Sequence, residues 1–206
     1  MRLFLYLPLF SILIFTILSA SSCQQITKPN YYTLPTYNAD NSVNVVVEIP
    51  AGTNHKIEYQ PGENAFINDT ENDKTRVVDY LPYPGNYGFI PSTLMSRAKG
   101  GDGDALDVLI LGESMPTKSV VATIPIAVLL LKDNGEIDSK IIAVPADSSQ
   151  QIMQITDFQD FLIEYDAAKR QIEQWFLNYK GVGEMQFMGW KDDKYARQEI
   201  EKWLLE

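Results

Sequence analysis

The stretch AKGGDGDALDVLILGE, residues 98–113, places three aspartates directly before an apolar segment. Asp102, Asp104 and Asp107 lie within six positions, and the apolar residues 108–111 follow at once. Carboxylates this close together repel one another unless positive charge lies between them. The apolar residues predict a strand that enters the core, so the carboxylate of Asp107 should be held close to it. The pattern therefore indicates a site that holds cations, with an ordinary solvated acidic turn as the alternative.

A calcium loop of the EF-hand type does not fit these aspartates. Counted from Asp102, the sixth position of such a loop is Asp107, where a glycine is required, and the loop would have to contain the apolar residues 108–111. A calcium loop of this type is therefore excluded for this cluster.

A second acidic cluster flanks the turn at Asn134-Gly135. Asp133 and Asp138 lie on either side of that turn, and Lys140 follows. Alone, this segment is an ordinary hairpin turn. If both clusters lie at the same mouth of a small barrel, five carboxylates converge there. Hard oxygen ligands in that number suit Mg²⁺ or Mn²⁺, which share their coordination with water and substrate phosphates.

Cations and phenols accompany the acidic clusters along the chain. Lys56, Arg76, Lys140 and Lys180 stand beside predicted strands or turns, and Tyr83, Tyr87 and Tyr179 offer hydroxyl donors. Taken singly, each of these cations is what an ordinary surface charge would look like, and each tyrosine is what a core aromatic would look like. Together with a metal site, they are what a phosphoryl substrate requires, because its oxygens need donors and its charge needs compensation.

The order of predicted elements indicates an α+β fold. Strands are predicted at residues 43–50, 105–112, 119–132 and 139–145, with extended chain at 55–60 and a hairpin or loop at 61–75. Residues 76–91 are dense in proline, glycine and aromatic residues and predict a rigid irregular connection. Two helices are predicted between residues 156 and 180, and a last one at 192–205. Strands first and helices afterwards favour a small barrel with helices packed against it.

The N-terminus has the features of an export signal. Arg2 precedes an apolar run that ends in small residues, and Cys23, the single cysteine of the chain, follows directly. This arrangement resembles a bacterial lipoprotein signal, in which the cysteine carries the lipid. We therefore expect a signal peptide at residues 1–22, a tether at 23–42 and one domain at 43–206. The protein would be exported and anchored by Cys23 to a bacterial membrane, on its periplasmic or cell-surface side.

The composition limits the choice of partners. The chain has 206 residues, 45% of them hydrophobic, and a formal net charge of −10. No basic stretch compensates this charge, so nucleic acid is excluded as a partner.

Several stretches, in this order, resemble the soluble inorganic pyrophosphatases of family I over almost all of the expected domain. They are VVVEIP at 45–50, HKIEY at 55–59, RVVDYLPYPGNYGFIP at 76–91, GDGDALDVLIL at 101–111, LLLKDNGEIDSKIIAVP at 129–145 and WFLNYK at 175–180. One departure is Ala105, where the family usually has proline. The change alters the stiffness of the loop and leaves every charged residue in place.

The resemblance implies a fold, a reaction and a role for each site residue. The fold would be a small closed, OB-like β-barrel with two or three helices. The reaction would be Mg²⁺-dependent hydrolysis of pyrophosphate, with Mn²⁺ as a substitute and Asp104 as the general base. The metal ligands would be Asp102, Asp107, Asp133 and Asp138, with Glu48 and Glu58 in or near that shell. The phosphate-binding residues would be Lys56, Arg76, Tyr87, Lys140, Tyr179 and Lys180.

Other functions and an assembly state remain open at this point. The chain could hydrolyse another phosphoanhydride on the same fold, or it could be a non-catalytic lipoprotein that binds metal or phosphate. Bacterial members of the family often form hexamers, so a homo-oligomer is a further expectation.

Overall fold

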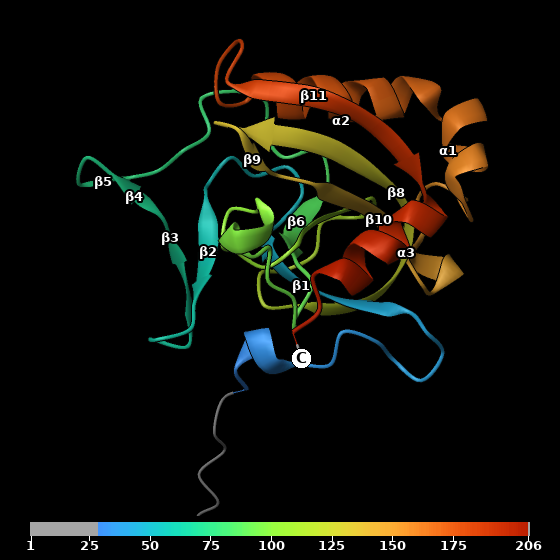
Figure 1. Ribbon diagram of the computed structural model, residues 1–206, viewed down its shortest axis with the longest axis horizontal. Coiled ribbons are helices and arrows are strands. Elements are labelled where there is room, and N and C mark those ends of the chain that lie inside the picture. Colours follow the sequence, from blue (N-terminus) through green and yellow to red (C-terminus); the bar gives the residue numbers. More distant parts are fainter. Residues whose placement is uncertain (1–28, 206) are drawn as a thin grey trace, which may run out of the picture.

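Five strands form a closed ring in the computed structural model, which describes residues 29–205 (Figure 1). Strand β1 (Val43–Ile49) pairs with β6 (Asn86–Phe89), β6 with β7 (Asp107–Ile110), and β7 with β10 (Lys140–Pro145). Strand β10 pairs with β8 (Val120–Asp133), which returns to β1 and closes the ring. The β7–β10 pair is parallel and the others are antiparallel. The expected small closed barrel is confirmed.

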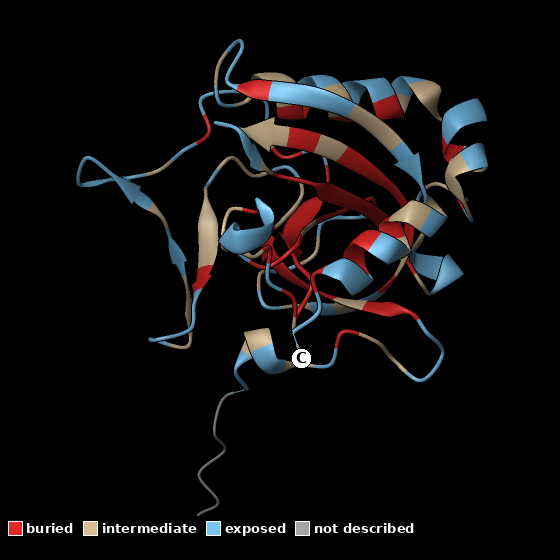
Figure 2. Cartoon of the chain, viewed as in Figure 1, coloured by how far each residue is buried: buried red, intermediate tan, exposed pale blue. Residues whose placement is uncertain are grey.

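Successive residues of the strands enter two different hydrophobic clusters. Leu109 of β7 belongs to the cluster that includes Phe176, whereas its neighbours Val108 and Ile110 belong to the cluster that includes Trp203. This follows from the alternation of side chains along a strand. Helices cover both clusters, so β1, β6, β7 and β10 are buried along most of their length, and β8 is buried in its middle (Figure 2). That explains why these strands appear in the sequence as continuous apolar runs.

Three helices follow the barrel strands, as predicted. Helices α1 (Phe158–Ile163) and α2 (Asp166–Asn178) lie between residues 156 and 180, and α3 (Asp193–Lys202) is the last helix. The side chain of Asp157 caps α1 by accepting hydrogen bonds from the backbone N–H groups of Gln159 and Asp160. Helix α2 packs on strand β11 (Met185–Asp192), and α3 packs on β8 (Figure 1).

Two strands differ from the sequence-based prediction. Residues 76–91 were expected to be irregular but contain β6, whose four residues include Gly88 and follow a Pro-Gly pair. Strand β11 was not predicted, because most of it is exposed and lacks alternation, and Gly189 with its φ of 132° interrupts the register with β8. Both are strands whose sequence carries turn-type residues, and their pairing partners impose the extended conformation.

Two small hairpins project from the barrel near the site described below. Residues 57–75, expected as extended chain and a hairpin or loop, form the hairpin of β2 (Ile57–Gln60) with β3 (Ala65–Asn68) and that of β4 (Thr70–Glu71) with β5 (Lys74–Thr75). The short β9 (Glu136–Ile137) pairs with the end of β8 across Asn134 and Gly135. These two residues have φ angles of 50° and 89°, as a two-residue hairpin turn requires.

The segment before the barrel differs from the expected tether of residues 23–42. Residues 29–42 pack on the domain: they include a short 3-10 turn (Tyr31–Thr33), and Thr36 is buried and donates its hydroxyl to the carbonyl of Pro91. The expected signal peptide, and Cys23 with it, lie outside the described residues. Within residues 29–205, no helix has the length and apolar character needed to cross a membrane.

Gly88 gives a direct test of the barrel's close strand packing. A methyl group at this position would lie 1.8 Å from the carbonyl oxygen of Val46 on β1. We therefore expect Gly88→Ala to lower the free energy of unfolding by at least about 1–3 kcal/mol, measured by urea denaturation. Gly62→Ala is the control, because nothing lies within 4 Å of the added methyl group there. Equal stability of the two variants would contradict the observed pairing of β1 with β6.

Candidate active site

The two acidic turns meet at one end of the barrel. Asp107 begins β7, and Lys140, which follows the second turn, is its register partner at the start of the parallel strand β10. The backbone N–H of Ile137 donates to the carbonyl oxygen of Gly100 at 2.7 Å, and Gly101 bridges to Ile137. The sequence predicted that five aspartates converge if both turns lie at the same mouth of the barrel. This convergence is confirmed.

Glycines shape the first acidic turn. A Cβ on Gly101 would lie 2.4 Å from the carbonyl oxygen of Met95, so only glycine fits there. The carbonyl oxygen of Met95 accepts from the N–H of Gly103, and the N–H of Met95 donates to the carbonyl of Asp104. The carboxylate of Asp102 accepts from the backbone N–H of Asp104 at 3.0 Å. The glycine-rich sequence therefore folds back on itself and presents its aspartates on one side.

A cavity of about 300 Å³ lies between the two turns. All predicted metal, substrate and base residues except Glu48 line it, namely Lys56, Glu58, Arg76, Tyr87, Asp102, Asp104, Asp107, Asp133, Asp138, Lys140, Tyr179 and Lys180. These residues come from strands, turns and the end of α2, far apart in the sequence. The structure thus brings together the residues that the sequence reasoning had grouped.

Lys140 is the most buried charge in the cavity wall, at 2% exposure. Its ammonium group pairs with the carboxylates of Asp107 and Asp138 and donates to the hydroxyl of Tyr87 at 3.1 Å. Burial lowers the pKa of Lys140, but the charges of Asp107 and Asp138 outweigh it and hold the pKa well above its ordinary value. Lys140 is therefore a permanent cation between the two acidic turns.

The remaining cations each hold one carboxylate. Lys180 pairs with Asp133, and Lys56 with Glu58 at 3.2 Å. Arg76 pairs with Asp69 at 2.9 Å. These three pairs are only partly buried, so exchanging a carboxylate partner for a ligand oxygen costs little. The phenol ring of Tyr179, at the end of α2, stacks on Trp175 with 4.6 Å between the ring centroids.

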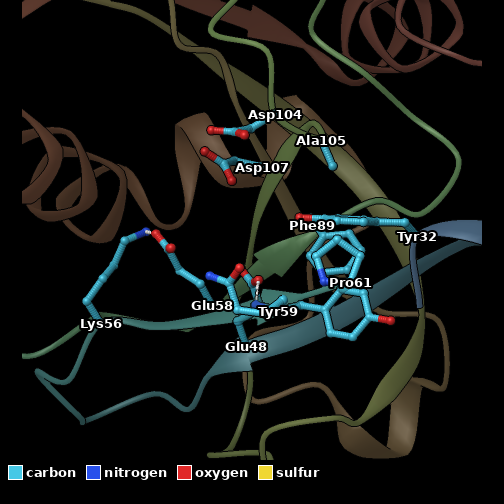
Figure 3. A pocket seen from close by; sticks show the side chains of 11 residues that line it. Tyr32, Glu48, Lys56, Glu58, Tyr59, Pro61, Phe89, Asp104, Ala105 and Asp107 are labelled. Atoms are coloured by element: carbon cyan, nitrogen blue, oxygen red, sulfur yellow. Dashed lines mark hydrogen bonds and ion pairs between the residues drawn. The ribbon is translucent and has the colours of Figure 1, made fainter. Parts of the chain in front are cut away.

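A second cavity, of about 340 Å³, adjoins the first (Figure 3). Lys56, Glu58, Asp104 and Asp107 line both cavities and so form the wall they share. Glu48 lines only the second, where its carboxylate accepts from the backbone N–H of Tyr59 at 2.7 Å. Glu48 is 7% exposed, and this burial raises the pKa of its carboxyl to about 8.

The aspartates of the first turn are also harder to ionise than usual. Burial raises the pKa of Asp102 to about 6. Burial, with the charges of Asp107 and Glu58, raises that of Asp104. A carboxylate whose pKa is raised towards neutrality is a better proton acceptor at physiological pH. Burial thus makes both Asp102 and Asp104 better proton acceptors than ordinary aspartates.

The chemistry of the lining fits hard divalent cations. The first cavity carries seven carboxylates and five lysine or arginine side chains, so its own charge is negative. Oxygen donors of this kind suit Mg²⁺ and related ions. No three metal-ligating side chains in residues 29–205 converge closely enough to hold an ion together, since lysines pair with Asp107, Asp133, Asp138 and Glu58. A bound ion would therefore compete with these lysines for the carboxylates.

Several residues that line the two cavities were not predicted as site residues from the sequence, among them Arg97, Glu136 and Tyr32. Arg97 and Glu136 line the first cavity and pair with each other at 3.0 Å, joining the two acidic turns from outside. Tyr32 lines the second cavity. The available signals were an arginine five positions before Asp102 and a tyrosine pair in an otherwise polar segment. The sequence position of neither the arginine nor the tyrosine pair indicates a site, so both could be assigned to the cavities only once the fold was known.

Comparison with known proteins gives a consistent answer. A family model described as inorganic pyrophosphatase matches residues 45–206. The inorganic pyrophosphatase of Sulfolobus acidocaldarius is 36% identical over 173 residues, which cover 81% of this chain and 92% of the relative. That of Mesorhizobium japonicum is 32% identical over 170 residues, covering 79% and 88%. The crystal structure of inorganic pyrophosphatase from Thermus thermophilus superposes with a TM-score of 0.72 at 32% identity, over 84% of this chain and 95% of that one.

The raised pKa of Glu48 predicts a pH dependence of stability. A carboxyl whose pKa rises from 4.5 to about 8 on folding binds its proton more tightly in the folded state. Between these pH values the metal-free protein should lose stability as pH rises, by up to about 1.4 kcal/mol per pH unit. Glu48→Gln, which keeps the acceptor for Tyr59, should flatten this slope in urea denaturation with excess chelator. Identical slopes would contradict a buried, proton-binding Glu48.

Proposed function

We propose how this chain, which belongs to the inorganic pyrophosphatase family and hydrolyses pyrophosphate to two phosphates, carries out that reaction in its acidic cavity. The observation that carries the proposal is the gathering of both acidic turns and of cationic residues, among them Lys56, Arg76, Lys140 and Lys180, around one cavity. A pyrophosphate anion needs such donors for its oxygens. The negative charge of the cavity also requires divalent ions to accompany the substrate.

We assign Mg²⁺ as the metal, with Mn²⁺ as a substitute, because every candidate ligand is a carboxylate. Asp102, Asp107, Asp133 and Asp138 would hold the ions, with Glu58 at the edge of the first cavity and Glu48 in the second. When bound, the ions would neutralise carboxylate and phosphate charge and lower the pKa of a nearby water. The carboxylates of Asp107 and Asp138 would then interact with both Lys140 and the metal.

Asp104 acts as the general base in this proposal. Its carboxylate takes a proton from a water molecule as the water oxygen attacks one phosphorus atom. The bond between that phosphorus and the bridging oxygen breaks, and the bridging oxygen leaves with the second phosphate. Asp104 is free for this task because, unlike Asp107, Asp133 and Asp138, it forms no ion pair with another of the residues 29–205.

Cations and phenols of the first cavity bind the two phosphates. Lys56, Arg76 and Lys180 can turn from their carboxylate partners to phosphate oxygens, because their present ion pairs are partly exposed and weak. Further hydrogen-bond donors for the phosphate oxygens lie on the barrel side of the cavity, on Lys140, Tyr87 and Tyr179. Charge that develops on the leaving phosphate would be stabilised by these groups.

Replacement of Asp104 tests the assignment of the base. We expect Asp104→Asn to lower kcat for phosphate release from pyrophosphate by about 10²–10⁴-fold, the usual contribution of a positioned general base. Calorimetric titration should still detect Mg²⁺ binding, because the proposed ligands remain. Asp73→Asn is the matched control: Asp73 is exposed in the β4–β5 turn and lines none of the cavities described here. An Asp104→Asn variant with native kcat would rule out this role.

We also propose that the chain is exported as a lipoprotein, on the basis of its first residues. A charged start, an apolar run and small residues precede Cys23. Cys23 lies six residues before residue 29, where the described structure begins. A thioether-linked lipid on Cys23 would place the pyrophosphatase domain on the outer side of a bacterial membrane. Hydrolysis would then act on extracytoplasmic pyrophosphate.

Labelling with radioactive palmitate in a bacterial host tests the lipid anchor. The native chain should incorporate label, and Cys23→Ser should incorporate none, because no other cysteine is present. The neighbouring Ser22→Ala variant keeps a small residue before the cysteine and should still be labelled. Label in Cys23→Ser, or its absence from the native chain, would contradict the proposal.

A further inference from the structure

Residues 29–36 extend the site beyond the part of the chain that matches the pyrophosphatase family. In the 3-10 turn, the backbone N–H of Tyr32 donates to the side chain of Asn30 at 3.1 Å, and the carbonyl of Tyr32 accepts from the N–H of Ser92 at 2.8 Å. The hydroxyl of Ser92 donates to the carbonyl of Leu34 at 2.9 Å. The backbone N–H of Tyr31 donates to the hydroxyl of Tyr59 at 3.2 Å, so this arm, residues 29–36, is held to the domain on both sides of Tyr32.

Aromatic packing fixes the direction of the Tyr32 ring. Its centroid lies 4.6 Å from that of Phe89 on β6 and 5.1 Å from that of Tyr59 on β2. Both partners are buried. Two ring contacts of this kind, on strands that belong to the barrel and to its hairpin, leave the side chain little freedom to rotate. The hydroxyl is therefore placed by the fold.

The hydroxyl of Tyr32 points into the second cavity. Figure 3 shows it directed towards the region between Asp104, Asp107 and Glu48. It forms no hydrogen bond with any other of the residues 29–205. Burial, followed by the charges of Glu48 and Asp104, raises the pKa of Tyr32 above its ordinary value of 10.0, so the group keeps its proton. It is a donor with no partner in the described protein, facing a polar cavity.

The two cavities differ in the charge they can accept. The first contains Arg76, Arg97, Lys140 and Lys180, whereas Lys56 is the single cation among the residues that line the second. Phosphate groups therefore belong in the first cavity. Asp104 lines both, so its carboxylate can face phosphate on one side and a neutral molecule on the other. The space beside Tyr32 suits water.

We propose that Tyr32 is a positioning residue for the attacking water. Its hydroxyl forms a hydrogen bond with the water, the water donates to Asp104, and a lone pair of the water oxygen faces the phosphorus. Tyr32 itself neither gains nor loses a proton. The inference deepens the proposed function and rests on the assignment of Asp104 as the base. It gives the arm a part in catalysis, although the arm lies outside the family match.

The test compares Tyr32→Phe with Tyr31→Phe in the full chain, purified in detergent. Tyr32→Phe keeps the ring contacts and removes only the hydroxyl. Tyr31 lies in the same turn and packs on Tyr59 and Phe66, but it does not line the cavity. Steady-state phosphate release from pyrophosphate gives kcat and KM, and thermal denaturation reports on folding.

We expect Tyr32→Phe to lower kcat about tenfold, as the loss of one hydrogen bond in the transition state would do, with KM for pyrophosphate within about twofold of native. Tyr31→Phe should match the native protein in both constants, and both variants should melt as the native protein does. Native kcat in Tyr32→Phe would overturn the proposal. So would an increase in KM alone, which would mean substrate binding, or equal losses in both variants with lower melting temperatures, which would mean a structural role.

The Asp104→Asn variant keeps the two proposals distinguishable. If Asp104→Asn is inactive and Tyr32→Phe behaves as native, the positioning role fails and the base assignment stands. If Asp104→Asn retains native kcat, the base assignment fails and the positioning role falls with it.

Discussion

The site depends on one buried cation, Lys140, which lies between Asp107 and Asp138 at the adjacent ends of two parallel strands. Without it, two carboxylates from separate turns would face each other in a poorly hydrated space. Removing one partner of such a buried pair typically costs about 3–5 kcal/mol, because the remaining charge is left uncompensated. The register of β7 with β10 and the position of the acidic turns are therefore linked to the same ion pairs that shape the cavity.

Most other charges of the site are balanced in pairs as well, but these pairs are looser. Lys56, Arg76 and Lys180 each hold a carboxylate in a partly exposed position, so metal ions and phosphate can replace the partners at little cost. Asp102 and Asp104 are different, since neither forms an ion pair with another of the residues 29–205, and burial raises the pKa of both. The site therefore contains both ion-paired carboxylates and carboxylates without an ion pair, and we assign proton transfer to one of the latter. In the proposed mechanism, the residues of the exposed pairs bind the phosphates, and Asp104 accepts the proton.

Much of this site could be predicted, because its residues lie in short motifs with a fixed order. Asp102, Asp104 and Asp107 stand before an apolar strand, and Asp133, Asp138 and Lys140 surround an Asn-Gly turn, so their meeting required only a closed barrel. Tyr32 and Arg97 could not be found in this way, because tertiary hydrogen bonds and ring contacts bring them to the cavities. Strands β6 and β11 were missed for a related reason. Their glycines and exposed positions weaken the local pattern, and pairing with β1, β7 and β8 decides their conformation.

The most direct test of the account is phosphate release from pyrophosphate by a soluble chain starting at Gln24, measured with Mg²⁺ and then with excess chelator. We expect rapid release of two phosphates for each pyrophosphate, loss of this release in chelator and its recovery when Mg²⁺ is restored. A folded protein that binds Mg²⁺ and releases no phosphate would contradict it, and would indicate that the acidic cavity binds metal or phosphate without catalysing hydrolysis.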